Sequence, residues 1–169
     1  MEKEQCTMRK DLQQMIARNK HQFGYICMAD VFIDSILTRY VQHEVKATVD
    51  YMIYDNAFNG AFHCFKFIVN RQEAEDAPTF DFWGTHNYLV MPEEVYKEIR
   101  YEDWFSKKLK KGKLGVVAQT DAGDPWTVVK PKVQKRSDYV KRSLLEAMLK
   151  TSLKEKGEGS NGCFGQRKI

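Results

Sequence analysis

The chain has 169 residues, 43% of them hydrophobic, and a formal net charge of +4. This length predicts one domain with a hydrophobic core of its own. No apolar run approaches the roughly 20 residues that a membrane span needs. The four cysteines are far apart, with no CxxC pair and no secretory leader, which indicates free thiols in a reducing compartment. We therefore expect a soluble, cytoplasmic protein.

Charge is unevenly distributed along the chain. Residues 107–142 contain eleven Lys or Arg and three Asp or Glu, a local charge of +8, whereas the residues before 107 sum to −6. A basic C-terminal half beside an acidic N-terminal half suits a polyanionic partner and bound cations. The alternative is a solvated lysine-rich surface, which is common in globular proteins.

The first elements follow from hydrophobic spacing. Residues 2–22 are predicted to form a helix because four apolar residues fall on one face: Met8, Leu12, Met15 and Ile16. Residues 24–34 are apolar almost throughout, as in a buried strand. A turn over 35–39 then leads to a second strand over 40–49.

The middle of the chain is ambiguous. Residues 50–66 show some alternation, but a helical stripe fits slightly better: Tyr51, Tyr54, Phe58, Ala61, Phe62 and Phe65. Gly60 weakens such a helix by about 1 kcal/mol relative to alanine. We expect mostly helix here, followed by a polar loop over 70–79.

The second half is predicted to begin with a strand at 86–91, which Pro92 ends. Pro92 and two acidic residues start a short helix, and an amphipathic segment follows around Trp104. A strand over 113–120 is predicted to pair with 126–130 across a turn of typical composition, DAGDP.

Ser137 and Asp138 are expected to cap a final helix. Its apolar face would comprise Val140, Leu144, Leu145, Met148, Leu149 and Leu153. We expect one domain over 1–155 and a disordered, glycine-rich tail over 156–169. The order of elements predicts an α/β fold with a mixed central sheet flanked by helices.

Candidate chemistry lies between residues 29 and 50. Asp30 and Glu44 would meet at one end of two adjacent strands, and Lys46 shares a strand face with Glu44. Two carboxylates suit Mg²⁺, with Mn²⁺ as the alternative, and a bound metal lowers the pKa of water for phosphodiester hydrolysis. The lysine would orient that water or stabilise developing negative charge. The alternative is an amphipathic strand with a surface salt bridge worth about 0.2–1 kcal/mol.

Several motifs occur in an order that resembles the PD-(D/E)XK nuclease superfamily, and within it the MmcB-type DNA-repair endonucleases and their phage relatives. They are ADVF, EVKAT, NYLVMPEE and KLGVVAQT, over about residues 8–150. The resemblance implies a restriction-endonuclease-like core, a divalent metal and hydrolysis of DNA. A glutamate that the family often has on its first helix has no clear counterpart here.

The resemblance also implies residue roles. Asp30, Glu44 and Lys46 would be catalytic, with Asp30, Glu44 and the carbonyl of Val45 holding the metal. Asp50 and Asp55 match acids that follow the lysine in these relatives, although Asp50 equally suits a helix N-cap.

Phosphate contacts are predicted for the basic segment: Lys107, Lys108, Lys110, Lys111, Lys113, Lys132, Lys135 and Arg136. The expected function is a metal-dependent DNA endonuclease of DNA repair or phage DNA metabolism, with a homodimer as an open possibility. The alternatives are a non-catalytic nucleic-acid-binding module on the same fold and a viral structural or host-interaction protein.

Overall fold

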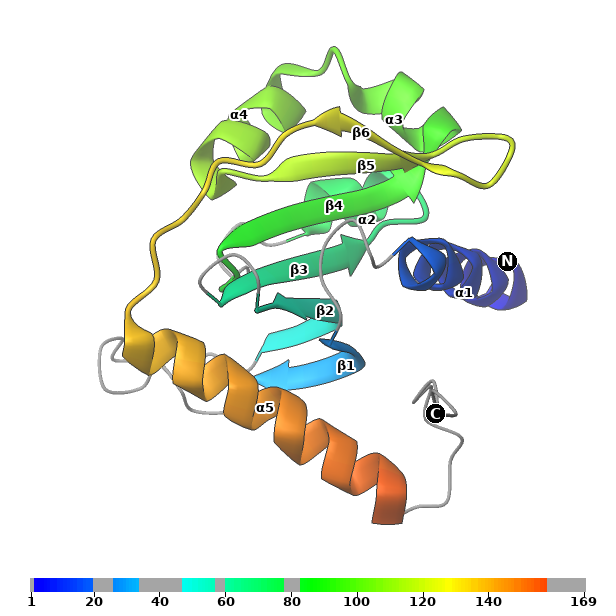
Figure 1. Cartoon of the computed structure of the whole chain (residues 1–169). Coiled ribbons are helices and arrows are strands. Elements are labelled where there is room, and N and C mark those ends of the chain that lie inside the picture. Colours follow the sequence, from blue (N-terminus) through cyan, green and yellow to red (C-terminus); the bar gives the residue numbers. More distant parts are fainter. Residues whose placement is uncertain (1, 20–25, 34–46, 57–59, 78–82, 158–169) are drawn as a thin grey trace.

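In a computed structural model, the protein forms one six-stranded sheet with helices on both faces (Figure 1). The structure describes residues 2–19, 26–33, 47–56, 60–77 and 83–157. The strands, adjacent in chain order, are β1 (Ile26–Ile33), β2 (Ala47–Asp55), β3 (Ala61–Phe67), β4 (His86–Pro92), β5 (Gly115–Gln119) and β6 (Pro125–Val129). The helices are α1 (Glu2–Arg18), α2 (Arg71–Asp76), α3 (Glu93–Ile99), α4 (Asp103–Gly112) and α5 (Asp138–Gly157).

Strand direction divides the sheet into three parts. β1, β2 and β3 form an antiparallel meander. β4 and β5 run parallel to β3, and β6 returns antiparallel beside β5. Parallel neighbours need crossover connections, and helices supply them: α2 lies between β3 and β4, while α3 and α4 lie between β4 and β5. The predicted α/β class with a mixed, helix-flanked sheet is confirmed.

The two faces of the sheet are covered by different helices. Leu12, Met15 and Ile16 of α1 pack on one face against β2 to β5. On β4, Leu89 and Met91 point to the opposite face and pack against α2, α3 and α4. The apolar side of α5 covers β1, β2 and β3 on that second face. Because both faces are buried, the central strands are apolar on both sides.

The helix predicted over 50–66 is wrong. This segment contains most of β2 and the larger part of β3. Tyr51 and Ile53 face α1 while Met52 faces α5, so the strand has apolar residues on both faces and lacks the alternation of a half-exposed strand. Gly60 leads into β3 with φ 69°, a conformation that glycine adopts without steric cost.

Two further boundaries differ from the prediction. Residues 71–76 form the short helix α2 instead of a loop, because the side chain of Asn70 accepts a hydrogen bond from the backbone N–H of Glu73 and caps the first turn. The strand predicted over 40–49 is described only from Ala47, and it continues to Asp55. Residues 34–46 lie outside the described part.

The remaining helices and strands agree with the prediction. The first helix, β1, β4, β5, β6, α3, α4 and α5 all occur where expected. On α5, however, only part of the predicted apolar face is buried: Leu144 and Met148 are covered, whereas Leu145, Leu149 and Leu153 are 40%, 60% and 60% exposed. α5 reaches Gly157, two residues beyond the predicted domain boundary. None of the described helices has the length and apolar character that a membrane crossing requires.

Candidate functional site

Asp30 interrupts the regular alternation of β1. Its backbone is left-handed, with φ 48°, a region that few residues other than glycine, asparagine and aspartate occupy. Met28 and Val31 belong to the same core cluster, although residues three apart on a regular strand face opposite sides. The side-chain alternation therefore shifts by one residue at Asp30. Non-glycine residues in this sparsely populated backbone region cluster at active sites and ligand-binding sites.

Asp50 occupies the corresponding position on β2. Val49 and Met52 also share one core cluster, so the alternation of this strand shifts at the same level of the sheet. Residues 29 and 31 pair with Tyr51 and Val49, and these flanking pairs place Asp30 opposite Asp50. Two carboxylates from neighbouring strands therefore meet at the same irregularity.

A lysine from the third strand completes this group. Lys66 on β3 donates a hydrogen bond from Nζ to Oδ1 of Asp50 at 2.9 Å. The backbone N–H of Phe67 donates to Oδ2 of the same carboxylate at 2.7 Å. Arg9 of α1 lies 3.8 Å from Asp50 and 2.8 Å from Glu73. Asp30, Asp50 and Lys66 are hereafter called the acidic site.

The environment of the acidic site disfavours the ionised form of Asp30. Burial raises the pKa of the Asp30 carboxyl, the charge of Asp50 raises it further, and Lys66 opposes both effects. The raised pKa means that the ionised form of Asp30 is disfavoured, because burial and the Asp50 charge together outweigh the effect of Lys66. A bound divalent cation would favour the ionised form.

Whether the donors fit a metal depends on its type. Within the part of the chain that the structure describes, no three Asp, Glu, His or Cys side chains converge as a complete metal-binding group. Mg²⁺ commonly uses only one or two protein carboxylates and fills its other positions with water and substrate phosphate. The carboxylates of Asp30 and Asp50 are therefore donors of the type that a magnesium or manganese ion takes, and they do not form a closed structural site.

The predicted catalytic set is only partly tested by this geometry. Asp30 lies in the acidic site, while Glu44, Val45 and Lys46 lie outside the described residues. Asp50, which was matched to an acid that follows the lysine or to a helix N-cap, stands within a strand opposite Asp30. Lys66 was not predicted, because the segment containing it was assigned to a helix. An aspartate followed on the next strand by a lysine was the available signal.

Cys64 stands two residues before Lys66, on the same face of β3. In the PD-(D/E)XK pattern, written D…ExK below, an acidic residue stands two positions before the lysine. Cys64 is fully buried, and burial raises the pKa of its thiol to about 12. The thiol is therefore neutral and contributes no negative charge to the acidic site.

Asp55 lies at the other end of β2 and is not part of this site. It is buried, and its charge acts on His63 and His86 at the beginnings of β3 and β4. The two imidazole rings are stacked with centroids 4.6 Å apart. Burial and the neighbouring ring lower the pKa of His63 to about 4, so both rings are neutral at pH 7.

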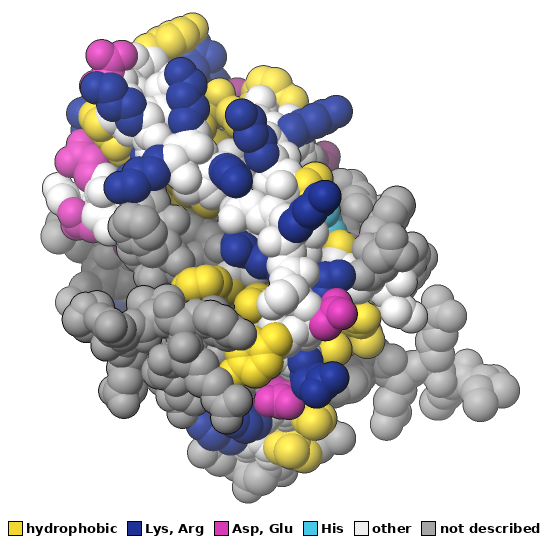
Figure 2. Space-filling view, turned by 90° about the vertical axis from the view of Figure 1, so that its left-hand side faces the viewer, with side chains coloured by type: hydrophobic (Ala, Val, Ile, Leu, Met, Phe, Trp, Pro, Cys, Tyr) yellow, Lys and Arg dark blue, Asp and Glu magenta, His cyan; other side chains and the backbone are white. Residues whose placement is uncertain are grey.

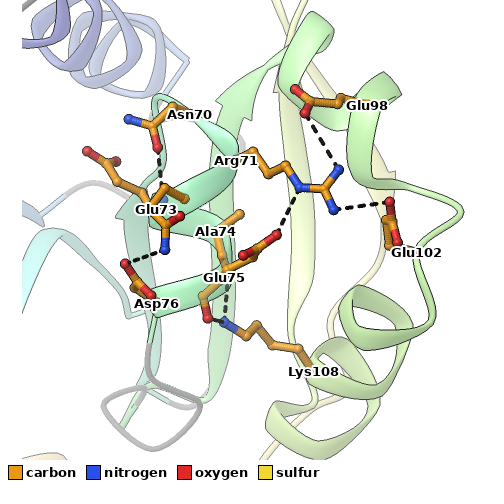
Figure 3. Close-up of polar contacts among 10 residues, drawn as sticks. Asn70, Arg71, Glu73, Ala74, Glu75, Asp76, Glu98, Glu102 and Lys108 are labelled. Carbon is orange, nitrogen blue, oxygen red and sulfur yellow. Dashed lines mark hydrogen bonds and ion pairs between the residues drawn. The ribbon is translucent and has the colours of Figure 1, made fainter.

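Lys108 is engaged within the protein. Its ammonium group donates hydrogen bonds of 2.6 Å each to the carbonyl oxygens of Ala74 and Glu75 (Figure 3). A third hydrogen bond, of 2.7 Å, goes to the carbonyl oxygen of Ala77. These carbonyls end α2, so Lys108 satisfies orphan acceptors there. An ammonium group has three donors, and all three are used. Lys108 therefore links α4 to α2 and has no donor left for phosphate.

Arg136 also makes structural contacts. It donates to the carbonyl oxygen of Gly84 at 3.1 Å and to the Gln134 side chain at 2.7 Å. Its guanidinium lies 5.8 Å from the centre of the Trp83 ring. The remaining predicted phosphate contacts have exposed side chains: Lys107, Lys110, Lys111, Lys113, Lys132 and Lys135.

Lys and Arg side chains gather on the face formed by the end of α4, the β6–α5 link and the start of α5 (Figure 2). An acidic groove of about 760 Å³ lies at the opposite end of the β5–β6 hairpin, between α1 and the turn. Five carboxylates line it: Glu4, Asp11, Glu94, Asp121 and Asp124. The two ends of the sheet therefore differ in charge.

Comparisons with known proteins support the fold alone. No protein-family model matches the chain, and no curated protein matches it significantly. Among solved structures, the fold is similar to that of the SPO1766 protein of unknown function from Silicibacter pomeroyi, with a TM-score of 0.62. The two are 15% identical, over 93% of this chain and 97% of that chain. The likeness therefore carries no activity across.

Proposed function

We propose that the protein is a divalent-cation-dependent hydrolase of nucleic-acid phosphodiester bonds, with its centre at the acidic site. One observation carries this proposal: Asp30, Asp50 and Lys66 lie together on three adjacent strands, where the side-chain alternation of two strands shifts. This is the combination of groups expected from the nuclease resemblance, at positions that differ from those predicted. Mg²⁺ is the proposed cofactor, with Mn²⁺ as its substitute, and DNA is the proposed substrate.

Each residue has a distinct role in this proposal. Asp30 and Asp50 provide hard oxygen ligands, and a bound cation would lower the pKa of a coordinated water and neutralise phosphate charge. Lys66 is placed to stabilise negative charge that develops on the phosphate. The Phe67 N–H and Arg9 orient the Asp50 carboxylate. The three cysteines among the described residues are free, which supports a reducing location such as the cytoplasm.

The test is a cleavage assay on labelled duplex, single-stranded and branched DNA, with Mg²⁺, Mn²⁺ or EDTA. Asp50→Asn and Lys66→Met should each reduce the metal-dependent rate at least 100-fold, a typical loss for an electrostatic catalytic group. Glu75→Gln is a matched control, because Glu75 pairs with Arg71 on α2. Full activity in Asp50→Asn would refute the proposed centre.

A second candidate function is nucleic-acid binding without turnover. The neutral, buried Cys64 favours it, because an acid is missing where the D…ExK pattern has one. In that case, the DNA would remain intact with either Mg²⁺ or Mn²⁺, while the protein would still bind DNA in a salt-dependent manner. Wild-type protein that neither cleaves nor binds DNA would refute both candidates.

A further inference from the structure

The β6–α5 link crosses the end of the sheet where β4 and β5 begin. Three of its backbone and side-chain groups are fixed to that end. The N–H of Lys132 donates to the carbonyl oxygen of Lys113 at 3.2 Å, and the N–H of Gln134 donates to that of Thr85 at 2.9 Å. The side-chain amide of Gln134 donates to the carbonyl oxygen of Gly112 at 3.1 Å.

The link also lies very close to β5. A Cβ atom at Gly115 would come within 2.7 Å of the Pro131 ring and within 2.8 Å of the Val129 carbonyl oxygen. Only glycine therefore permits this approach without movement of the link. Together with the Arg136 contact to Gly84, these contacts hold residues 129–136 along the sheet.

Lysine side chains project from this fixed segment into solvent. Lys130, Lys132 and Lys135 are exposed on the link, and Lys110 and Lys113 are exposed at the end of α4 beside it. These five residues are called the lysine ridge; Figure 2 shows the face on which they lie. An extended chain spans at most about 17 Å from Lys130 to Lys135, the length of about five nucleotides of one duplex strand.

Two of the three acidic residues in the basic segment lie away from the lysine ridge. The basic segment 107–142 contains only three acids, Asp121, Asp124 and Asp138. Asp121 and Asp124 belong to the β5–β6 turn and line the acidic groove at the other end of the hairpin. The third acid, Asp138, follows the link at the start of α5, so two of the segment's three acids are separated from the ridge.

We infer that the lysine ridge binds the phosphodiester backbone of a nucleic acid, without reading its bases, and that Gln134 holds the ridge in its binding geometry. The inference takes its partner from the proposed function and adds a binding surface separate from the acidic site. Lysine contacts to phosphate carry no sequence information. Fixing the link in advance reduces the conformational entropy lost on binding.

The test is fluorescence anisotropy with a fluorescein-labelled 20-base-pair DNA duplex of mixed sequence and the matching single strand, in EDTA, from 50 to 200 mM salt. Changing Lys130, Lys132 and Lys135 together to glutamine should weaken duplex binding at least 10-fold at 50 mM salt. It should also make the slope of log K against log salt shallower by about 3, because three phosphate contacts are lost.

A matched triple variant controls for net charge. Lys10, Lys150 and Lys154 are also exposed, and changing them to glutamine should alter affinity less than about 3-fold. Gln134→Ala should weaken binding about 3- to 10-fold at an unchanged salt slope, because every lysine remains. An affinity unaffected by the ridge substitutions, or an equal loss in the control triple, would overturn the inference.

Two further outcomes separate the inference from its alternatives. Poly-aspartate of matched charge that competes as well as DNA would overturn nucleic acid as the specific partner. Glu75→Gln should bind DNA as wild type does, because Glu75 pairs with Arg71 on α2 and belongs to neither the ridge nor the acidic site. DNA binding that depends on the ridge, without any cleavage, would refute the proposed hydrolase and support the ridge assignment. DNA cleavage with binding that does not depend on the ridge would support the hydrolase and refute the ridge assignment.

Discussion

Asp50 and Lys66 face each other across β2 and β3 at a distance of 2.9 Å. The carboxylate also accepts the N–H of Phe67 on its other oxygen, so both of its oxygens have protein donors. Asp30, on the other side of Asp50, is instead disfavoured as an anion. The acidic site therefore combines one carboxylate with fixed partners and one whose ionised form burial disfavours.

Asp30→Asn should raise the melting temperature at pH 7. The pKa of the native carboxyl is raised, so ionisation destabilises the folded state at pH values above both the native and unfolded pKa. This penalty diminishes as the pH falls through the native pKa and is absent below the unfolded value. The stabilisation by Asp30→Asn should therefore disappear near pH 3. Thermal unfolding followed by circular dichroism measures it, and an Asn variant less stable than wild type at pH 7 would contradict the prediction.

Addition of Mg²⁺ should stabilise the wild-type protein by mass action, because a ligand that binds the native state raises its stability. At 10 mM Mg²⁺ we expect a higher melting temperature for wild type and no change for Asp30→Asn or Asp50→Asn. A comparison of Na₂SO₄ with MgSO₄ at matched ionic strength distinguishes binding from screening. An equal shift in all three proteins would mean that the ion does not bind at the acidic site.

Acid should destabilise the protein through His63. Its native pKa is lowered to about 4, so the unfolded chain binds a proton more readily than the folded one between about pH 6.5 and pH 4. Stability should fall over that window by up to about 3 kcal/mol. His63→Phe retains an aromatic ring and removes the titrating group, so urea unfolding of this variant should show a shallower pH dependence. Parallel curves for both proteins would exclude His63 as the cause.

Cys64 should be inert to alkylating reagents in the folded protein. Its thiol is fully buried and its pKa is raised to about 12, and the thiolate is the reactive form. Cys6 is exposed and should react at least 10-fold faster with iodoacetamide at pH 8. Peptide mass spectrometry at timed intervals measures the labelling rates of both cysteines. The Cys64→Ser variant confirms which labelled peptide contains Cys64. Equal labelling without denaturant would show that the core beneath α5 opens.

Lys108→Met should destabilise the fold by about 2 kcal/mol, because three carbonyl oxygens at the end of α2 lose a charged donor. Lys107→Met is the matched control: its side chain is exposed, and its effect should stay within about 0.5 kcal/mol. Urea unfolding of the two variants provides the comparison. DNA affinity should be little affected by Lys108→Met, because that ammonium group already has its partners.

The sequence determined most of the elements whose signal is local. α1, α3 and β4 follow from apolar spacing, a proline at the start of a helix and a continuous apolar run, which act within a few residues. The β5–β6 hairpin follows from its turn residues. Asp30 was identified as a candidate site residue because it is a charged residue within an apolar run, a signal that needs no information from the rest of the chain.

The tertiary structure alone decided β2, β3 and the partners of Asp30. Burial on both faces weakened the alternation that would have identified these strands, so a helical stripe fitted the segment slightly better. The register then placed Asp50 opposite Asp30 and beside Lys66. Asp30 and Lys66 are 36 positions apart in the sequence. Tertiary contacts likewise distinguish Lys108 and Arg136, which bind backbone carbonyls, from the exposed lysines of the basic segment. Pairing between distant strands depends on the packing of the whole sheet, and no local pattern encodes it.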